Sequence, residues 1–179
     1  MIACKKDQQA SPEKVDKNKK SVEIMNAIRP KLYGTWIMKR VDVKAILTAR
    51  GEIGIQKDTT LTDFANLTVT LVDNYSQPLN DINNDVTGFL SFRAKAYPVG
   101  FRMMASPSWL SHSTGPQTVA LFDYRFPVGT HIVGADEQYL RYLTVVGDNY
   151  TIQVSDDGKT MVWKGLNRAI RQIDFVKQN

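Results

Sequence analysis

The chain has 179 residues, of which 42% are hydrophobic, and a formal net charge of +5 at pH 7. This length fits one domain with a sizeable core, and no apolar run reaches the roughly 18 residues that a membrane-spanning helix needs. The excess charge lies near the start, where residues 5–20 hold six lysines against three acidic residues. A basic groove interleaved with aromatic residues is not evident, so we expect no nucleic-acid binding.

The only cysteine, Cys4, follows Met1-Ile2-Ala3 and precedes Lys5-Lys6-Asp7. This start resembles the end of a bacterial lipoprotein signal peptide, and its polar continuation is similar to lipoproteins of Bacteroides-type bacteria. The resemblance implies that Cys4 is lipidated and anchors the protein at the cell envelope, in the outer membrane, facing either the periplasm or the cell surface. We expect the missing part of the signal peptide to be encoded upstream of Met1. The alternative is a free, unreactive thiol.

Residues 1–20 are therefore expected to comprise the remnant of the lipidation motif and a flexible tether. The tether, residues 5–20, is too polar to bury the surface that would offset its ordering entropy. The domain of residues 21–179 would begin with a short helix, which Ser21 would cap and Pro30 would end.

The first long strand is expected over residues 37–45. Within it Val41, Val43 and Ala45 alternate with charged residues. That alternation is typical of a strand with one buried face and one solvated face.

Gly34-Thr35-Trp36 opens this strand directly after the predicted helix. The arrangement resembles the signature of the lipocalin family, and residues 150–163 are similar to lipocalin-like domains of Bacteroides-type lipoproteins. The resemblance implies a barrel closed at its base by Trp36. It also implies that a basic residue from the far end of the chain, Arg168 or Arg171, packs against that ring.

The middle of the chain is expected to add several strands. Two Pro-Val-Gly tripeptides, at residues 98–100 and 127–129, would form turns within strand pairs. Trp109 lies in an irregular connection and would cap the barrel mouth or contact a sugar or a partner. The expected strands cover residues 67–72, 89–97, 101–105, 118–126 and 130–133, with a polar loop at 73–85 and the irregular connection at 106–116.

Residues 139–177 contain four β-rich runs separated by turn residues, which predicts an antiparallel meander. With Asp157-Gly158 as a two-residue turn, Val154 would pair with Met161, and Ile152 with Trp163. All four side chains are apolar and would share one face, whereas a shift of one residue would destroy this match.

With about eight to ten strands, the chain is predicted to be all-β, an antiparallel up-and-down (lipocalin-like) β-barrel with a short N-terminal helix. Such a barrel either encloses a ligand cavity or is filled by its own side chains, and the sequence leaves both open. The candidate residues for binding a ligand inside it are Trp36, Tyr150, Ile152, Val154, Met161 and Trp163.

The residues do not combine into a predicted enzyme. The serines near His112 form no nucleophile elbow, the paired acidic residues fall in turns, and one cysteine excludes a zinc site built from cysteines. We therefore expect no catalytic residue, metal or cofactor. The leading hypothesis is a non-catalytic, lipid-anchored protein that binds a small hydrophobic molecule or an envelope component. The alternatives are a filled barrel serving as a protein-interaction or structural subunit, and a carbohydrate-binding accessory lipoprotein.

Overall fold

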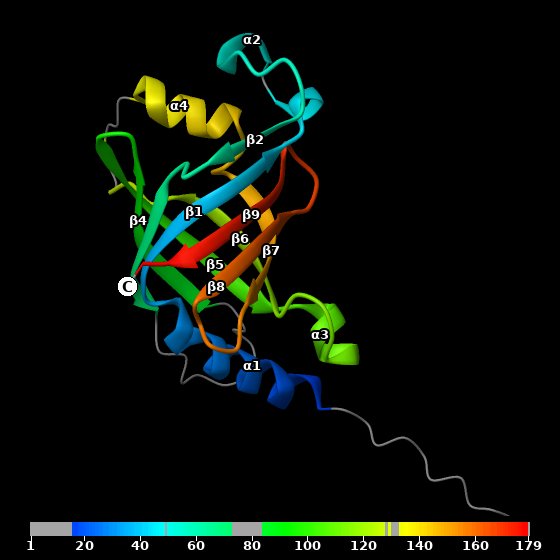
Figure 1. Ribbon diagram of the computed structural model, residues 1–179. Helices are drawn as coiled ribbons and strands as arrows, with labels where there is room; N and C mark the ends of the chain where they lie inside the picture. The colour runs from blue at the N-terminus through cyan, green and yellow to red at the C-terminus, as the bar shows by residue number, and fades with distance from the viewer. Residues whose placement is uncertain (1–15, 49, 73–83, 128, 130–132, 179) are drawn as a thin grey trace, which may run out of the picture.

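The computed structural model describes residues 16–178 with the exception of residues 49, 73–83, 128 and 130–132. Its centre is a closed antiparallel β-barrel with helices at both ends (Figure 1). The strands are β1 (Gly34–Val43), β2 (Thr59–Thr62), β3 (Asn66–Val72), β4 (Asn84–Phe92), β5 (Lys95–Ala105), β6 (Thr118–Tyr124), β7 (Asp148–Val154), β8 (Thr160–Gly165) and β9 (Ile170–Lys177). The helices are α1 (Lys17–Leu32), the 3-10 helix η1 (Ala45–Leu47), α2 (Arg50–Ile53), α3 (Pro107–His112) and α4 (Ala135–Tyr142).

The barrel closes through β1. Along one side β1 pairs with β9, and along the other it pairs first with β3 and then with β2. Because β2 and β3 share one position beside β1, the closed barrel has eight positions, and strands from β3 to β9 follow one another in sequence order. The predicted alternation of the first strand is confirmed as far as Val43, since Val41 and Val43 are buried while Arg40 and Asp42 lie on the outer face. The strand ends there, two residues earlier than predicted, and Ala45 begins η1.

The N-terminal helix α1 is longer than predicted at both ends. It begins at Lys17 because the Asp16 side chain accepts hydrogen bonds from the backbone N–H groups of Asn18 and Lys19, at 3.0 and 3.1 Å. Ser21 is thus buried inside the helix rather than capping it. Pro30 lies inside the last turn rather than ending the helix, so that turn lacks one backbone donor.

The predicted register of the β7–β8 hairpin is confirmed. Ile152 pairs with Trp163, and Val154 pairs with Met161. The turn is wider than the two residues expected, because the regular ladder ends at Val154 and the Gly158 N–H donates to the Ser155 carbonyl at 3.0 Å. Gly158 has a φ of +68°, a left-handed conformation that favours glycine.

The first Pro-Val-Gly tripeptide is not a turn, so that prediction was wrong. Residues 98–100 lie within the continuous strand β5, and the hairpin turn falls instead at residues 93–94. Pro98 is tolerated near the end of the ladder with β6, where its carbonyl accepts from Arg125 N–H at 2.9 Å. Gly100 is required by close packing, since an added Cβ would lie 2.8 Å from the Val86 carbonyl oxygen.

The prediction that residues 139–146 form the first strand of the C-terminal meander was also wrong. Residues 135–142 form α4, whose first turn carries Asp136 and Glu137 at the end of the helix dipole that favours negative charge. The irregular connection after β5 contains α3, β4 begins at Asn84, and β6 ends at Tyr124. Val128 of the second Pro-Val-Gly tripeptide lies outside the described residues, as do residues 130–132 of the strand expected at 130–133 and residues 73–83 of the polar loop.

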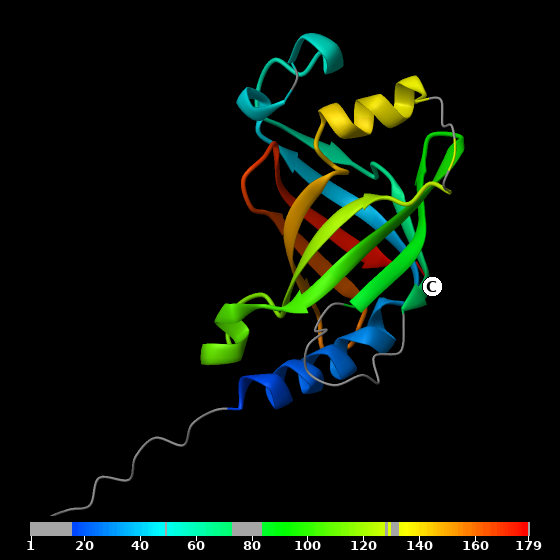
Figure 2. The ribbon, with the colours of Figure 1, turned by 180° about the vertical axis from the view of Figure 1, so that it is seen from behind.

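Helices cover the two ends of the barrel. Figure 1 shows α1 across one end and α4, with the neighbouring α2, at the other, and Figure 2 shows α3 beside α1 from behind. The apolar side chains of α1 and those in and after α4 join the same core as the strands. In α1 these are Ile24, Met25, Ile28 and Leu32, and at the opposite end Leu140, Leu143, Val145 and Val146.

Candidate functional site

The centre of the barrel is occupied by Trp163. Its ring contacts four other aromatic rings at centroid distances between 5.0 and 5.3 Å. Aromatic pairs at such distances stabilise a core by about 0.5–1.5 kcal/mol each beyond their buried area. The four rings belong to Phe101, Phe122, Tyr150 and Phe175.

All six residues predicted to line the interior are buried there. Trp36, Tyr150, Ile152 and Trp163 are 0% exposed, and Met161 and Val154 are 1% and 2% exposed. A side chain with no exposed area borders no space that a water molecule can enter, whether inside or outside the protein. These six residues therefore do not line a cavity of ligand size.

Three buried polar atoms on inward-facing positions of the barrel have no hydrogen-bond partner within the described residues: Trp163 Nε1, Thr118 Oγ1 and Tyr97 Oη. Trp163 and Thr118 lie close together, because each of them pairs with Ile152 across a neighbouring strand. Such atoms cost free energy unless something pairs with them. They are the feature of the interior that favours an additional polar group.

Trp36 lies at the base of the barrel, under α1. Its Nε1 donates to the Leu32 carbonyl at 2.8 Å, and the Lys177 ammonium lies 5.0 Å from its ring centroid. Lys177 also donates to the Lys31 carbonyl at 2.8 Å, which ties β9 to α1.

The basic residue packed against Trp36 is thus Lys177. The expectation of Arg168 or Arg171 was wrong because both arginines face other carboxylates. Arg168 lies 3.8 Å from Asp148, and Arg171 lies 2.8 Å from Asp58.

The opposite end of the barrel carries a buried carboxyl group, Asp148, at the start of β7. Its side chain is 4% exposed, and its Oδ2 has no partner among the described residues. Burial raises the pKa of Asp148, and the backbone N–H of Asn149 and the Arg168 charge only partly oppose this. Nearby, the Tyr150 hydroxyl contacts the Thr144 and Val145 carbonyls at 2.8 and 3.0 Å.

Trp109 lies apart from the interior group, on α3. Its side chain is partly buried against the edge of the core. The helix is fastened to α1 by Lys20, which donates to the Leu110 carbonyl and to the Ser113 hydroxyl at 3.1 and 2.7 Å. Contact with a sugar or partner through Trp109 stays a prediction, and Cys4 lies outside the described residues.

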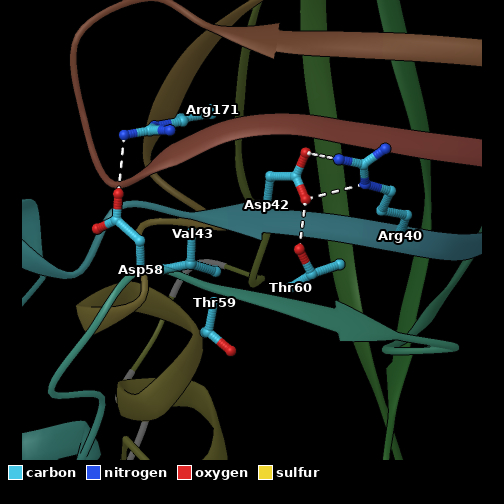
Figure 3. A pocket seen from close by; sticks show the side chains of 7 residues that line it. All are labelled: Arg40, Asp42, Val43, Asp58, Thr59, Thr60 and Arg171. Atoms are coloured by element: carbon cyan, nitrogen blue, oxygen red, sulfur yellow. Dashed lines mark hydrogen bonds and ion pairs between the residues drawn. The ribbon is translucent and has the colours of Figure 1, made fainter.

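The outer face of β1, β2 and β9 holds a pocket of about 440 Å³ (Figure 3). Two ion pairs border it. Arg171 binds Asp58 on one side, and Arg40 binds Asp42 on the other, at 2.8 and 2.7 Å. We name it the seam pocket because β1 and β9 close the barrel there; its lining residues are Arg40, Asp42, Val43, Asp58, Thr59, Thr60 and Arg171.

Both carboxylates of the seam pocket are fixed by further hydrogen bonds. Asp42 accepts from the Thr60 hydroxyl at 2.8 Å, and Asp58 accepts from the Ala45 backbone N–H at 2.9 Å. Partial burial acts to raise the pKa of Asp42, but the hydrogen bonds from Arg40 and Thr60 and the nearby charges outweigh it and leave the pKa below its ordinary value. Asp42 is therefore ionised at neutral pH.

A second, apolar groove of about 330 Å³ lies on the outer face of the barrel where β5, β6 and β7 run side by side. Three large apolar side chains of its lining are 40–48% exposed. They are Met104, Leu121 and Leu166, with Arg102 and Asn149 at the rim.

Neither outer site could be recognised in the sequence. The alternation in the first strand placed Arg40 and Asp42 on its solvated face. The sequence did not indicate that they line one pocket with Asp58 and Arg171. The apolar groove combines residues that alternate with buried ones along separate strands, and each looked like an ordinary outward position.

No protein-family model, curated protein or solved structure matches this chain. Within the described residues, no helix is long and apolar enough to cross a membrane. In the same part of the chain, no three His, Cys, Asp or Glu side chains gather as metal ligands would.

Proposed function

We propose that this protein is a non-catalytic, lipid-anchored protein of the cell envelope whose filled barrel acts through its outer surface, as a protein-interaction or structural subunit. The observation that carries the proposal is the absence of exposed surface on Trp36, Tyr150, Ile152 and Trp163. A ligand-binding barrel keeps an open interior, whereas a filled one offers only its outside.

The proposal includes a lipocalin-like identity for the barrel. The support for it is Gly34-Thr35-Trp36 at the start of β1, the helix before it, and the packing of Lys177 on Trp36. Anchoring in the outer membrane is supported by the lipoprotein-like residues around Cys4. Expressed in its own host, the protein should partition with membranes, and Cys4→Ser should release it; release that does not depend on Cys4 would overturn this part.

The apolar groove supports the interaction role. Met, Leu and Arg side chains around a shallow groove are suited to contact a protein partner. A photo-crosslinking residue placed at Leu121 in the native host should give a discrete adduct. The same residue at Gln153, which is exposed on β7, is the matched control. Equal labelling at both positions, or none at Leu121, would contradict an interaction through this face.

The interior is tested by a screen of fatty acids, sterols, retinoids and haem, followed by tryptophan fluorescence. A filled barrel should give no saturable change with any of them. A saturable change that Val154→Trp abolishes and Gln153→Ala preserves would show a ligand inside the barrel and overturn the proposal.

The second candidate function is binding of a small hydrophobic ligand in the barrel. The observation that favours it is the pair of unpartnered interior atoms, Trp163 Nε1 and Thr118 Oγ1, which a polar group of such a ligand would satisfy. It requires the aromatic cluster around Trp163 to rearrange, and the same screen decides between the two candidates.

A further inference from the structure

The seam pocket has the size of a small-molecule binding site, and its lining is almost entirely polar. Its volume of about 440 Å³ falls in the usual range for small-molecule sites. Figure 3 shows the Arg171–Asp58 pair on one side of it and Asp42 with Arg40 and Thr60 on the other. The pocket is open to solvent, since Arg40, Asp58 and Arg171 are each about half exposed.

The charges of the pocket cancel. Two arginines face two aspartates, so a simple anion would meet Asp42 and Asp58, and a simple cation would meet Arg40 and Arg171. Because the opposite charges cancel, the electrostatics of the pocket favour neither an anion nor a cation. The ligand that fits best therefore carries no net charge.

The pocket nevertheless offers both donors and acceptors. Arg171 uses one N–H group to bind Asp58, and Arg40 binds Asp42 through Nε and Nη2. Each guanidinium has further N–H donors beyond those bonds. The carboxylate oxygens and the Thr59 and Thr60 hydroxyls add acceptors, so the lining offers polar groups of both kinds.

The acceptors are held in place before any ligand arrives. Asp58 is bound to Ala45 and Arg171, and Asp42 to Thr60 and Arg40. Fixing them in advance lowers the entropy that binding would otherwise cost.

We propose that the seam pocket binds a neutral saccharide. Each sugar hydroxyl donates and accepts, and adjacent hydroxyls on a ring match the paired atoms of a carboxylate or a guanidinium. The β1 residues that line the pocket, Arg40, Asp42 and Val43, lie at the end of β1 away from α1 (Figure 1). This site is separate from Trp109, and the inference does not depend on how the barrel is anchored or on whether its interior is filled.

The test uses the whole chain and three probes, maltotriose, chitotriose and trigalacturonic acid, with NMR of the arginine side-chain Nε–Hε signals. A neutral trisaccharide should shift the Arg40 and Arg171 signals saturably, with weak affinity because the lining residues include no aromatic ring. Shifts with trigalacturonic acid alone would reveal an anion site and overturn the proposal, as would no saturable shift with any probe.

Matched variants locate the binding. Arg171→Lys keeps the charge but loses the planar fork, and should weaken saccharide binding roughly tenfold or more. Arg141→Lys makes the same change on α4, beside Asp123, and should leave binding unchanged. Equal effects of the two variants, with backbone spectra that report a folded protein, would place the saccharide elsewhere and overturn the assignment.

Discussion

The inward and outward faces of β1 differ in burial and in charge, although their residues alternate along the same strand. Inward, Val41 and Val43 join a core that leaves almost no surface exposed. Outward, Arg40 and Asp42 border an open, charge-balanced pocket. The inner face supplies stability and the outer face carries the proposed saccharide site, so substitutions on the two faces should differ in kind as well as in size.

The largest effect is expected at the centre of the core. Trp163→Ala should lower the free energy of unfolding by about 3–5 kcal/mol, because it removes a ring that contacts four others and leaves a cavity. Urea denaturation measures this. Gln153→Ala, at an exposed position of the adjacent strand, should change the value by about 0.5 kcal/mol or less. Similar losses for both variants would contradict the contrast between the faces.

The next effect distinguishes a filled interior from a hollow one. Val154→Trp should destabilise the protein by about 1–3 kcal/mol, since the larger ring has no space to enter beside Met161. A hollow barrel would accept the ring at little cost. An unchanged denaturation midpoint for Val154→Trp would therefore count against the filled barrel.

The contact at the base is expected to contribute less. Lys177→Met keeps most of the side-chain length but removes the cation over Trp36 and the hydrogen bond to Lys31, at a cost of about 1–2 kcal/mol. Lys164→Met, a lysine exposed on β8, is the control and should be near neutral. If Lys177→Met left the free energy of unfolding unchanged, the contacts of Lys177 with Trp36 and with the Lys31 carbonyl would not stabilise the base of the barrel.

The pH dependence of stability should reveal Asp148. Because burial raises its pKa in the native state, the folded protein holds this proton more tightly than the unfolded chain. The free energy of unfolding should therefore decrease as pH rises from about 4, the ordinary carboxyl pKa, through the higher native pKa. Asp148→Asn should remove this decrease. The free energy of unfolding of the variant, relative to that of the original protein, should therefore increase toward neutral pH. An Asp148→Asn variant that loses stability toward neutral pH would show that the native state favours the charged form.

The smallest effect is expected on the outside. Arg171→Ala should change the free energy of unfolding by about 1 kcal/mol or less, because the Arg171–Asp58 pair is half exposed and solvent screens it. Added salt should reduce that small difference further. A loss as large as that of Trp163→Ala would mean that the seam pocket is part of the structural core.

The sequence was most informative where turn chemistry and side-chain alternation agree. The hairpin of residues 152–163 was predictable because the position of Gly158 and the apolar face of both strands demand the same register. The turn predicted at residues 98–100 was wrong, because Pro98 and Gly100 have roles within a strand rather than in a turn. Gly100 allows a close approach to the Val86 backbone, and Pro98 lies at the end of a ladder.

Features that depend on barrel closure could not be predicted from the sequence. The seam pocket is lined by residues of β1, of β9, and of β2 with the segment that precedes it. Only the pairing of β1 with β9 brings Asp58 to Arg171. The packing of Trp163 likewise depends on rings from several strands. The pattern predicted that Trp163 faces inward, but it did not reveal whether the space around it is filled.

The central claim, that the barrel is filled, is tested most directly by a crystal structure determined under xenon pressure. Xenon occupies apolar cavities of modest size inside proteins. We expect no xenon atom inside the barrel among Tyr150, Ile152, Val154, Met161 and Trp163. A xenon atom bound beside Trp163 would contradict the account and return the interior to the role of a ligand site.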